Sequence, residues 1–310
     1  MGYIFIGLTA VIFSTMEITG KLIVGVNPLQ LNFLRFLIGG LFLVPFALRS
    51  MKYKKIKLKK EDFLYFVMTG FLCVVVSMSF FQLAVTYTKA STVAIIFSTN
   101  PVFTIILAYF VLKEKMNRGT VISVVLSIVG MVFILNPFGI NSDMKGISFA
   151  FLSAVSFSIY AVIGKLRSER YGCMVLNCMT FLTGDIIMFF LMLISKMPVI
   201  INFIGTNENL RFMADIPIFY GISSVNIIPV MFLGIVVTGM GYMFYFLAMD
   251  KTSASMASMV FFIKPVLAPI FALIVLEETI LANTTIGICF ILIGSYFSVG
   301  WRGKSVLAKD

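Results

Sequence analysis

The stretch Ala84–Met131, AVTYTKASTVAIIFSTNPVFTIILAYFVLKEKMNRGTVISVVLSIVGM, has a second copy 164 residues later, at Ala248–Ser295, with no gap between the two alignments. The identities fall on polar, small, aromatic and proline positions, so a shared apolar composition does not account for them. We therefore predict two copies of one structural plan. Identical pairs include Thr88/Thr252, Ala90/Ala254, Ser91/Ser255, Phe97/Phe261, Pro101/Pro265, Glu114/Glu278 and Gly130/Gly294.

A weaker repeat with an offset of 144 residues precedes the strong one. Phe13-Ser14 corresponds to Phe157-Ser158, and Gly20-Lys21-Leu22 corresponds to Gly164-Lys165-Leu166. Together the two offsets predict an N-terminal half at residues 1–140 and a C-terminal half at residues 141–310.

The composition is that of an integral membrane protein, with 60% hydrophobic and 12% charged residues among 310. The net charge of +11 does not indicate nucleic acid as a partner, because the basic residues lie in short loops between apolar runs. Histidine is absent, and the four cysteines lie in or beside apolar runs without CxxC spacing, so we expect no metal, cofactor or disulfide framework. The first apolar run follows no basic segment and is expected to be a retained helix.

Ten apolar runs are long enough to cross a hydrocarbon core, which takes about 20 helical residues. They are too uniformly apolar for barrel strands, whose residues alternate. The predicted fold is therefore an all-α integral membrane bundle of ten transmembrane helices, since helices satisfy their own backbone groups in lipid. The runs lie at about 3–24, 29–48, 62–85, 90–112, 118–136, 145–165, 173–195, 226–248, 254–276 and 281–300.

The distribution of Lys and Arg predicts the orientation. With the N-terminus in the cytoplasm, seventeen of these residues face inward and five face outward. We expect a multi-pass protein of the cell membrane with both termini cytoplasmic. The basic segment 49–61 is read as a topology determinant, with a specific lipid site as the alternative. The long outer connection, 196–225, is either a lid or an interfacial segment.

Five helices in each half is an odd number, so the second half must enter the membrane from the side opposite to the first. This predicts two inverted five-helix repeats, the architecture of many secondary transporters. A site between such halves can be opened to one face by one half and to the other face by its inverted twin.

Several motifs resemble the EamA family of the drug/metabolite transporter superfamily, and the resemblance covers nearly the whole chain. The resemblance implies a ten-helix exporter or permease for small metabolites such as amino acids. It also implies a central cavity lined by helices 1, 3, 4, 6, 8 and 9. The motifs are Thr88-Lys89-Ala90-Ser91, Pro101-Val102-Phe103 and Leu112-Lys113-Glu114 with their second copies, and Phe13-Ser14, Gly20-Lys21 and Arg35.

Lys264 is the first candidate for the functional site. It replaces Asn100 of the first copy and precedes Pro265, which removes a backbone donor and is expected to disturb the helix. A charge inside the membrane costs about 2.5–3.5 kcal/mol on insertion scales, so such residues face the bundle interior. Lys264 either attracts a substrate carboxylate or phosphate, or forms a structural ion pair with Asp185 or Glu17.

Glu17 is the second candidate. It lies four residues before Lys21, which predicts a local ion pair on one helix face. The alternative is a carboxylate that takes up a proton in its buried setting and couples proton movement to transport, which makes protons the candidate coupling ion. Arg35, two turns into the second predicted helix, is expected to be structural or to snorkel to the interface, with substrate contact as the alternative.

The remaining candidates follow from symmetry and from the family resemblance. Asn100 and Lys264 occupy equivalent positions, so both are expected to border the cavity. The hydroxyl groups of Tyr160, Tyr242 and Tyr245, in helices that the resemblance places around the cavity, either bind substrate or only pack. Pro101 and Pro265 are predicted to be structural kinks, and Asp185 is expected to be a structural contact.

The preferred function is a secondary active transporter that moves small metabolites, amino acids or related organic compounds, across the cytoplasmic membrane by alternating access. Export is the favoured direction. The alternatives are a membrane scaffold or receptor that transports nothing, and an enzyme that modifies lipids. An enzyme is not expected, because the sequence lacks a cluster of catalytic groups. The expected partners are a small-molecule substrate and the lipid bilayer.

Overall fold

A computed structural model describes residues 2–113, 118–135, 144–204, 210–251, 257 and 260–307, and within these ranges the regular elements are helices, with no strand. Seven helical segments are long and apolar enough to cross a membrane. This confirms the predicted all-helical membrane class. The seven segments are Gly2–Leu22, Pro28–Lys54, Lys60–Tyr87, Ala90–Val111, Met144–Ser168, Cys173–Ile194 and Ser224–Ala248.

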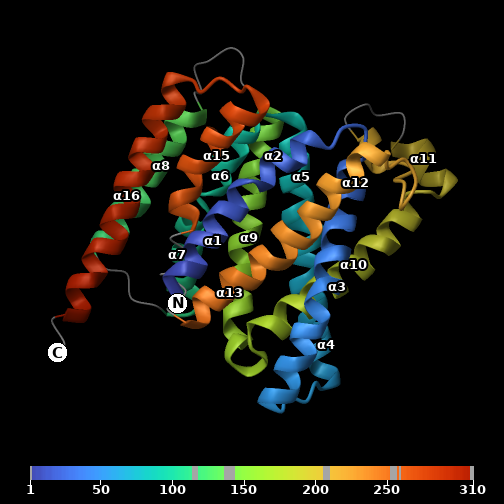
Figure 1. Ribbon diagram of the computed structural model, residues 1–310, viewed down its shortest axis with the longest axis horizontal. Coiled ribbons are helices and arrows are strands. Elements are labelled where there is room, and N and C mark those ends of the chain that lie inside the picture. The colour runs from blue at the N-terminus through green and yellow to red at the C-terminus, as the bar shows by residue number, and fades with distance from the viewer. Residues whose placement is uncertain are drawn as a thin grey trace.

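Each of the three other predicted runs overlaps a helix. These helices are α8 (Arg118–Leu135), α15 (Val260–Leu276) and α16 (Ala282–Leu307). α8 and α16 lie side by side at one edge of the bundle (Figure 1). The start of the ninth predicted run falls partly outside the described residues, so ten spans remain a prediction.

Several spans consist of more than one helical element. The first contains α1 (Gly2–Ser14) and α2 (Met16–Leu22), which are separated at Thr15. The fourth contains α6 (Ala90–Phe97) and α7 (Asn100–Val111). The other helices are α3 (Pro28–Lys54), α4 (Lys60–Gly70), α5 (Met78–Tyr87), α9 (Met144–Tyr171), α10 (Cys173–Ile194), α11 (Pro198–Ile204), α12 (Ser224–Met231) and α13 (Tyr242–Lys251).

Two spans contain a π-helical segment, η1 at Phe71–Ser77 and η3 at Phe232–Gly241. Adding the repeat offset of 164 to the first segment gives 235–241, which lies inside the second. π-Helical turns are rare and often occur at functional sites. The two π-helical segments therefore occupy equivalent positions in the two copies of the repeat.

The interruption of the fourth span lies just before Pro101. Proline has no N–H, so the Phe97 carbonyl loses its usual helical donor. The Asn100 side chain supplies a replacement, since its Nδ2 donates to Phe97 O at 2.9 Å. In the second copy α15 continues through Pro265 as an unbroken helix. The disturbance predicted beside Lys264 therefore does not interrupt this helix.

Equivalent residues of the two halves meet in the interior. The Phe13 and Phe261 rings are 6.4 Å apart, and their counterparts Phe157 and Phe97 are 5.2 Å apart. Phe97 and Phe261 also contact each other, at 6.2 Å between ring centroids. The aromatic side chains that the sequence repeats thus form one cluster between the halves.

The long connection after α10 is tied to the start of α3. Gln30 Nε2 donates to Ile218 O and Tyr220 O at 3.2 and 2.8 Å, and Asn27 Nδ2 donates to Phe212 O at 2.9 Å. α11, in the same connection, buries none of its residues. Figure 1 shows it projecting from the bundle at the end where α12 begins.

Glu278 caps a helix of the other half. Its carboxylate accepts from the backbone N–H groups of Ala90 and Ser91, at 2.8 and 3.1 Å, and from the Ser91 hydroxyl at 2.7 Å. These contacts satisfy free N–H groups at the start of α6 and place a negative charge at the positive end of its dipole. The equivalent residue, Glu114, lies outside the described residues.

We expect Glu278→Gln to lower the free energy of unfolding by about 0.5–2 kcal/mol, because a charged cap of α6 is lost. Glu277→Gln is the matched control. Glu277 is exposed, and this substitution removes the same charge from the neighbouring position. The measurement is denaturant unfolding of both purified variants. Equal stability of the two variants would contradict the capping role.

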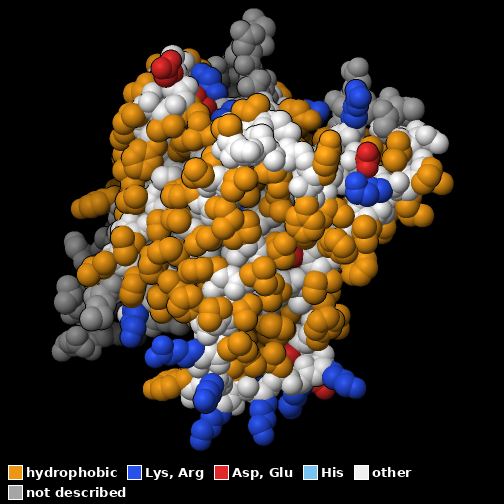
Figure 2. Space-filling view, turned by 45° about the vertical axis from the view of Figure 1, so that its right-hand side comes forward, with side chains coloured by type: hydrophobic (Ala, Val, Ile, Leu, Met, Phe, Trp, Pro, Cys, Tyr) orange, Lys and Arg blue, Asp and Glu red, His pale blue; other side chains and the backbone are white. Residues whose placement is uncertain are grey.

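The end of the bundle that carries Arg49, Lys52, Lys57, Lys60 and Arg170 is called the basic end. Figure 2 shows its Lys and Arg side chains below a wide band of hydrophobic side chains. The N-terminus and the end of α16 lie toward the same end (Figure 1).

Asp62 links two helices at the basic end. It pairs with Arg170 at 3.0 Å and accepts the Tyr171 hydroxyl at 2.7 Å. Burial, together with this hydrogen bond, raises the pKa of Tyr171, so the phenol stays a donor at neutral pH. These contacts join the start of α4 in the first half to the end of α9 in the second.

Candidate functional site

A buried ion pair joins the two halves. Glu17 Oε1, on α2, lies 2.6 Å from Lys264 Nζ, on α15, and both side chains are fully buried. Of the two acidic partners predicted for Lys264, Asp185 and Glu17, the structure pairs it with Glu17. Lys21, the local partner predicted for Glu17, instead donates to Val85 O at 2.8 Å.

Aromatic rings surround the Lys264 ammonium group. Its nitrogen lies 5.1 Å from the centre of the Phe97 ring and 5.7 Å from that of Phe81. Ring faces attract cations, and the effect grows where water is excluded. α5 and α6 of the first half therefore supply rings to a cation of the second half.

The hydrogen bonding of the pair is incomplete. Apart from their mutual contact, the Glu17 carboxylate and the Lys264 ammonium have no hydrogen-bond partner among the described residues. Removing two charges from water costs several kcal/mol per ion, which a close pair offsets fully only when further hydrogen bonds are made. The second carboxylate oxygen of Glu17 is therefore available to a proton or to a polar group of a substrate.

Arg35 lies in the interior and does not snorkel. It is fully buried, and its Nη2 lies 3.3 Å from Met16 Sδ and 3.8 Å from Met78 Sδ. Thioether sulfur is a weak acceptor, and Arg35 Nε and Nη1 have no partner among the described residues. Of the roles expected for Arg35, structural or interfacial, burial excludes snorkelling, because the side chain contacts α2 and α5 rather than extending to the end of α3. The structural role and the alternative of substrate contact stay predictions.

Arg35 and Lys264 belong to one cluster. The Arg35 guanidinium carbon lies 5.7 Å from the centre of the Phe81 ring, the same distance as the Lys264 nitrogen. The cluster of Glu17, Arg35 and Lys264 contains two cationic side chains and one carboxylate. Among the described residues, no acidic side chain lies within salt-bridge distance of Arg35.

Asp185 lies on α10 and is also buried, but it does not pair with Lys264. Neither of its carboxylate oxygens has a hydrogen-bond partner among the described residues. A buried carboxyl group without a partner is far more stable when it is protonated. Its expected role as a structural contact remains a prediction.

The other candidates are buried as well. Asn100 supports the helix interruption described above, and Tyr160 donates to Asn177 Oδ1 at 3.1 Å. The Tyr242 hydroxyl lies 3.8 Å from Met78 Sδ, which also contacts Arg35. Tyr245 packs edge-on against Phe261 at 5.7 Å. The charged cluster and these side chains are thus closed off from solvent in this conformation.

Two features of this region could not be predicted from the sequence. The first is the interruption at Thr15, two residues before Glu17; no proline or glycine marks it. The second is the pair of π-helical segments, one of which ends directly before Met78. Both depend on packing between helices, which local sequence patterns do not report.

The comparisons with known proteins assign the chain to a membrane transporter family. The sequence profile described as "EamA-like transporter family" matches residues 1–136 and 144–300. The chain belongs to this family, which confirms the resemblance.

Relatives that match over most of their length are described as transporters. The chain is 43% identical to an "Uncharacterized transporter" of Clostridium kluyveri, over 98% of this chain and 94% of the relative. It is 26% identical to one of Archaeoglobus fulgidus, over 89% and 90% of the two chains. It is 24% identical to "Uncharacterized transporter YoaV" of Bacillus subtilis, over 88% and 87%. A crystal structure with 14% identity has the same fold, with a TM-score of 0.69 and 97% of each chain covered.

Proposed function

We propose that the protein is a secondary active transporter that exports amino acids or related small metabolites across the cell membrane by alternating access. The two halves, residues 1–140 and 141–310, act as inverted five-helix repeats of a ten-helix bundle. The basic end faces the cytoplasm, as the positive-inside rule favours. The two separate family matches and the offset between η1 and η3 support this organisation.

The observation that carries the proposal is the buried Glu17–Lys264 pair. One member comes from each half, so any movement of one half against the other changes the contact. In the closed conformation Lys264 neutralises Glu17. When the halves separate, Glu17 takes up a proton or Lys264 binds a substrate anion, since neither charge is stable alone in the interior.

The charge of the cluster supports a substrate with a carboxylate. Two cations, Arg35 and Lys264, accompany the single carboxylate of Glu17, and two donor nitrogens of Arg35 have no partner in the part of the chain that the structure describes. Guanidinium groups bind carboxylates through paired hydrogen bonds. An amino acid would present its carboxylate to these cations and its ammonium group to Glu17.

The test is flux of a labelled amino-acid mixture in proteoliposomes with and without a pH gradient. We expect the wild-type flux to depend on the gradient, and we expect Glu17→Gln to lose that dependence because it cannot exchange a proton. Glu61→Gln is the control, since Glu61 is an exposed carboxylate at the start of α4. Flux through Glu17→Gln that still follows the gradient would exclude proton coupling at Glu17. Absence of wild-type flux would exclude the substrate class.

A further inference from the structure

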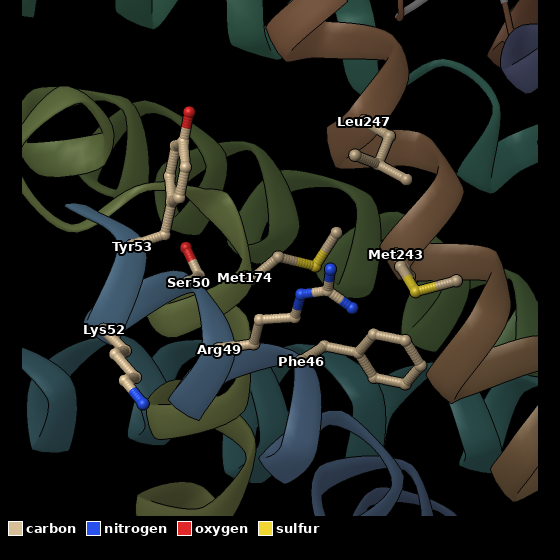
Figure 3. Close-up of a pocket in the computed structure, with 8 residues that line it drawn as sticks. All are labelled: Phe46, Arg49, Ser50, Lys52, Tyr53, Met174, Met243 and Leu247. Carbon is tan, nitrogen blue, oxygen red and sulfur yellow. The ribbon is translucent and has the colours of Figure 1, made fainter.

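A groove of about 690 Å³ lies at the basic end, on the outer side of α3, α10 and α13. This is within the range of pockets that hold small ligands, about 300–1,000 Å³. Its apolar walls come from three helices. The lining residues are Phe46, Arg49, Ser50, Lys52, Tyr53, Met174, Met243 and Leu247 (Figure 3).

The polarity of the groove changes along α3. This helix has 27 residues, about 40 Å at 1.5 Å per residue, which exceeds a hydrocarbon core of about 30 Å. Counted from Pro28, a core of about 20 residues ends near Leu48, so Phe46 falls within it and Arg49 and Lys52 fall at the level of the lipid head groups. The lining of the groove is mostly apolar, and its two cationic residues lie at the end nearer the membrane surface.

Arg49 is the cation that faces the groove. Figure 3 shows its guanidinium group pointing toward the Met174 and Met243 side chains, while Lys52 points away toward the surface. Arg49 forms no hydrogen bond or ion pair with any described residue. An unpaired guanidinium group above an apolar wall fits a ligand with an anionic head and a hydrocarbon tail.

We propose that this groove binds an anionic glycerophospholipid of the surrounding membrane. The phosphate contacts Arg49, with the Ser50 hydroxyl as a further donor, and Lys52 adds positive charge at the head-group level without direct contact. One acyl chain lies against Phe46, Met174, Met243 and Leu247. Basic pockets between transmembrane helices are suited to such head groups, because Lys and Arg side chains near the membrane surface attract anionic lipids. The site is separate from the Glu17–Lys264 cluster and does not depend on the proposed transport function.

The occupied groove would join the halves at their surface, because α3 belongs to the first half and α10 and α13 to the second. A bound lipid therefore stabilises the relative position of these helices. We expect phosphatidylglycerol to raise the melting temperature of the protein, since a ligand of the native state does so.

The test measures binding of phosphatidylglycerol and phosphatidylcholine to the purified full-length protein in a neutral detergent, by native mass spectrometry and by melting temperature. We expect wild type to prefer phosphatidylglycerol. The double variant Arg49→Gln/Lys52→Gln should weaken that binding about tenfold or more. The control Lys57→Gln/Lys60→Gln removes the same charge from exposed positions outside the groove and should bind as wild type does.

A second variant tests the apolar wall. Met174→Trp fills the groove while it keeps every charge, and should also weaken phosphatidylglycerol binding; its melting temperature in phosphatidylcholine reports whether it is folded. Equal losses in the two charge variants would overturn the proposal, because they would indicate attraction by the basic end as a whole. Equal binding of both lipids would also overturn it, as would equal stabilisation by glycerol 3-phosphate alone.

Discussion

Lys264→Met is expected to abolish transport and to lower the free energy of unfolding by about 3–5 kcal/mol, because it leaves the buried Glu17 carboxylate without its partner. Both side chains are fully buried at 2.6 Å from each other, so water cannot replace the lost ammonium group in the closed conformation. Glu17→Gln leaves Lys264 unpaired in the same way and should destabilise the protein similarly.

The double variant Glu17→Met/Lys264→Met separates the structural role of the pair from its functional role. Replacing both members of a buried pair with apolar side chains of similar size is often neutral or stabilising. We therefore expect the double variant to recover most of the lost stability but none of the transport. Unfolding titrations and flux in proteoliposomes measure the two quantities. Transport by the double variant at a near-normal rate would remove the pair from the mechanism.

Gly184→Val is expected to produce the second large effect, a loss of stability of about 1–3 kcal/mol or more from overpacking. Gly184 on α10 faces Gly70 at the end of α4. A Cβ atom on Gly184 would lie 2.6 Å from Val74 Cγ2 and 2.7 Å from Gly70 O. The second clash is with backbone, so a side-chain rotation does not relieve it. Small residues allow helices in lipid to approach this closely.

Gly7→Val is the matched control for this substitution. Gly7 lies in α1, is exposed, and has nothing within 4 Å of an added Cβ. We expect Gly7→Val to change the free energy of unfolding by no more than about 0.5 kcal/mol. The measurement is the melting temperature of both variants in the same detergent. Equal melting temperatures would show that the α4–α10 contact is looser than the structure indicates.

A similar glycine contact between the halves joins α3 to η3. The offset of 164 takes Gly70 to Gly234, and the offset of 144 takes Gly40 to Gly184. Gly39, beside Gly40, is close to Gly234, since a Cβ atom on Gly39 would lie 3.1 Å from Gly234 O. The sequence does not identify these glycines as contact positions, because a glycine in an apolar run does not reveal which helix it faces.

The helices could be predicted from the sequence because the membrane imposes their length and polarity. The runs at 29–48, 62–85 and 173–195 have their counterparts in α3, in the elements from α4 to α5, and in α10. The helix interruption near Pro101 also follows from local chemistry, since proline removes a backbone donor. Pro265 shows the limit of this reasoning, because packing keeps α15 helical through the equivalent position.

The candidate site could be predicted only in part. The sequence marked Glu17, Arg35 and Lys264 as costly charges in apolar runs, but it left the partners of Glu17 and Lys264 open. The pairing depends on how α2 meets α15, a contact between residues 247 positions apart in the chain. Arg35 illustrates the same limit, since its position near a helix end suggested snorkelling whereas tertiary packing turns it inward. The Glu278 cap joins the two halves and is equally long-range.

The most direct test of the account is the accessibility of Ser98→Cys in a variant whose four native cysteines are replaced. Ser98 is buried and follows Phe97, whose ring centre lies 5.1 Å from Lys264 Nζ. If the halves open alternately around the ion pair, a membrane-impermeant thiol reagent will label this cysteine from either side of a proteoliposome. A reversed pH gradient will change which side labels faster. Labelling from one side alone under every gradient would contradict alternating access at this site.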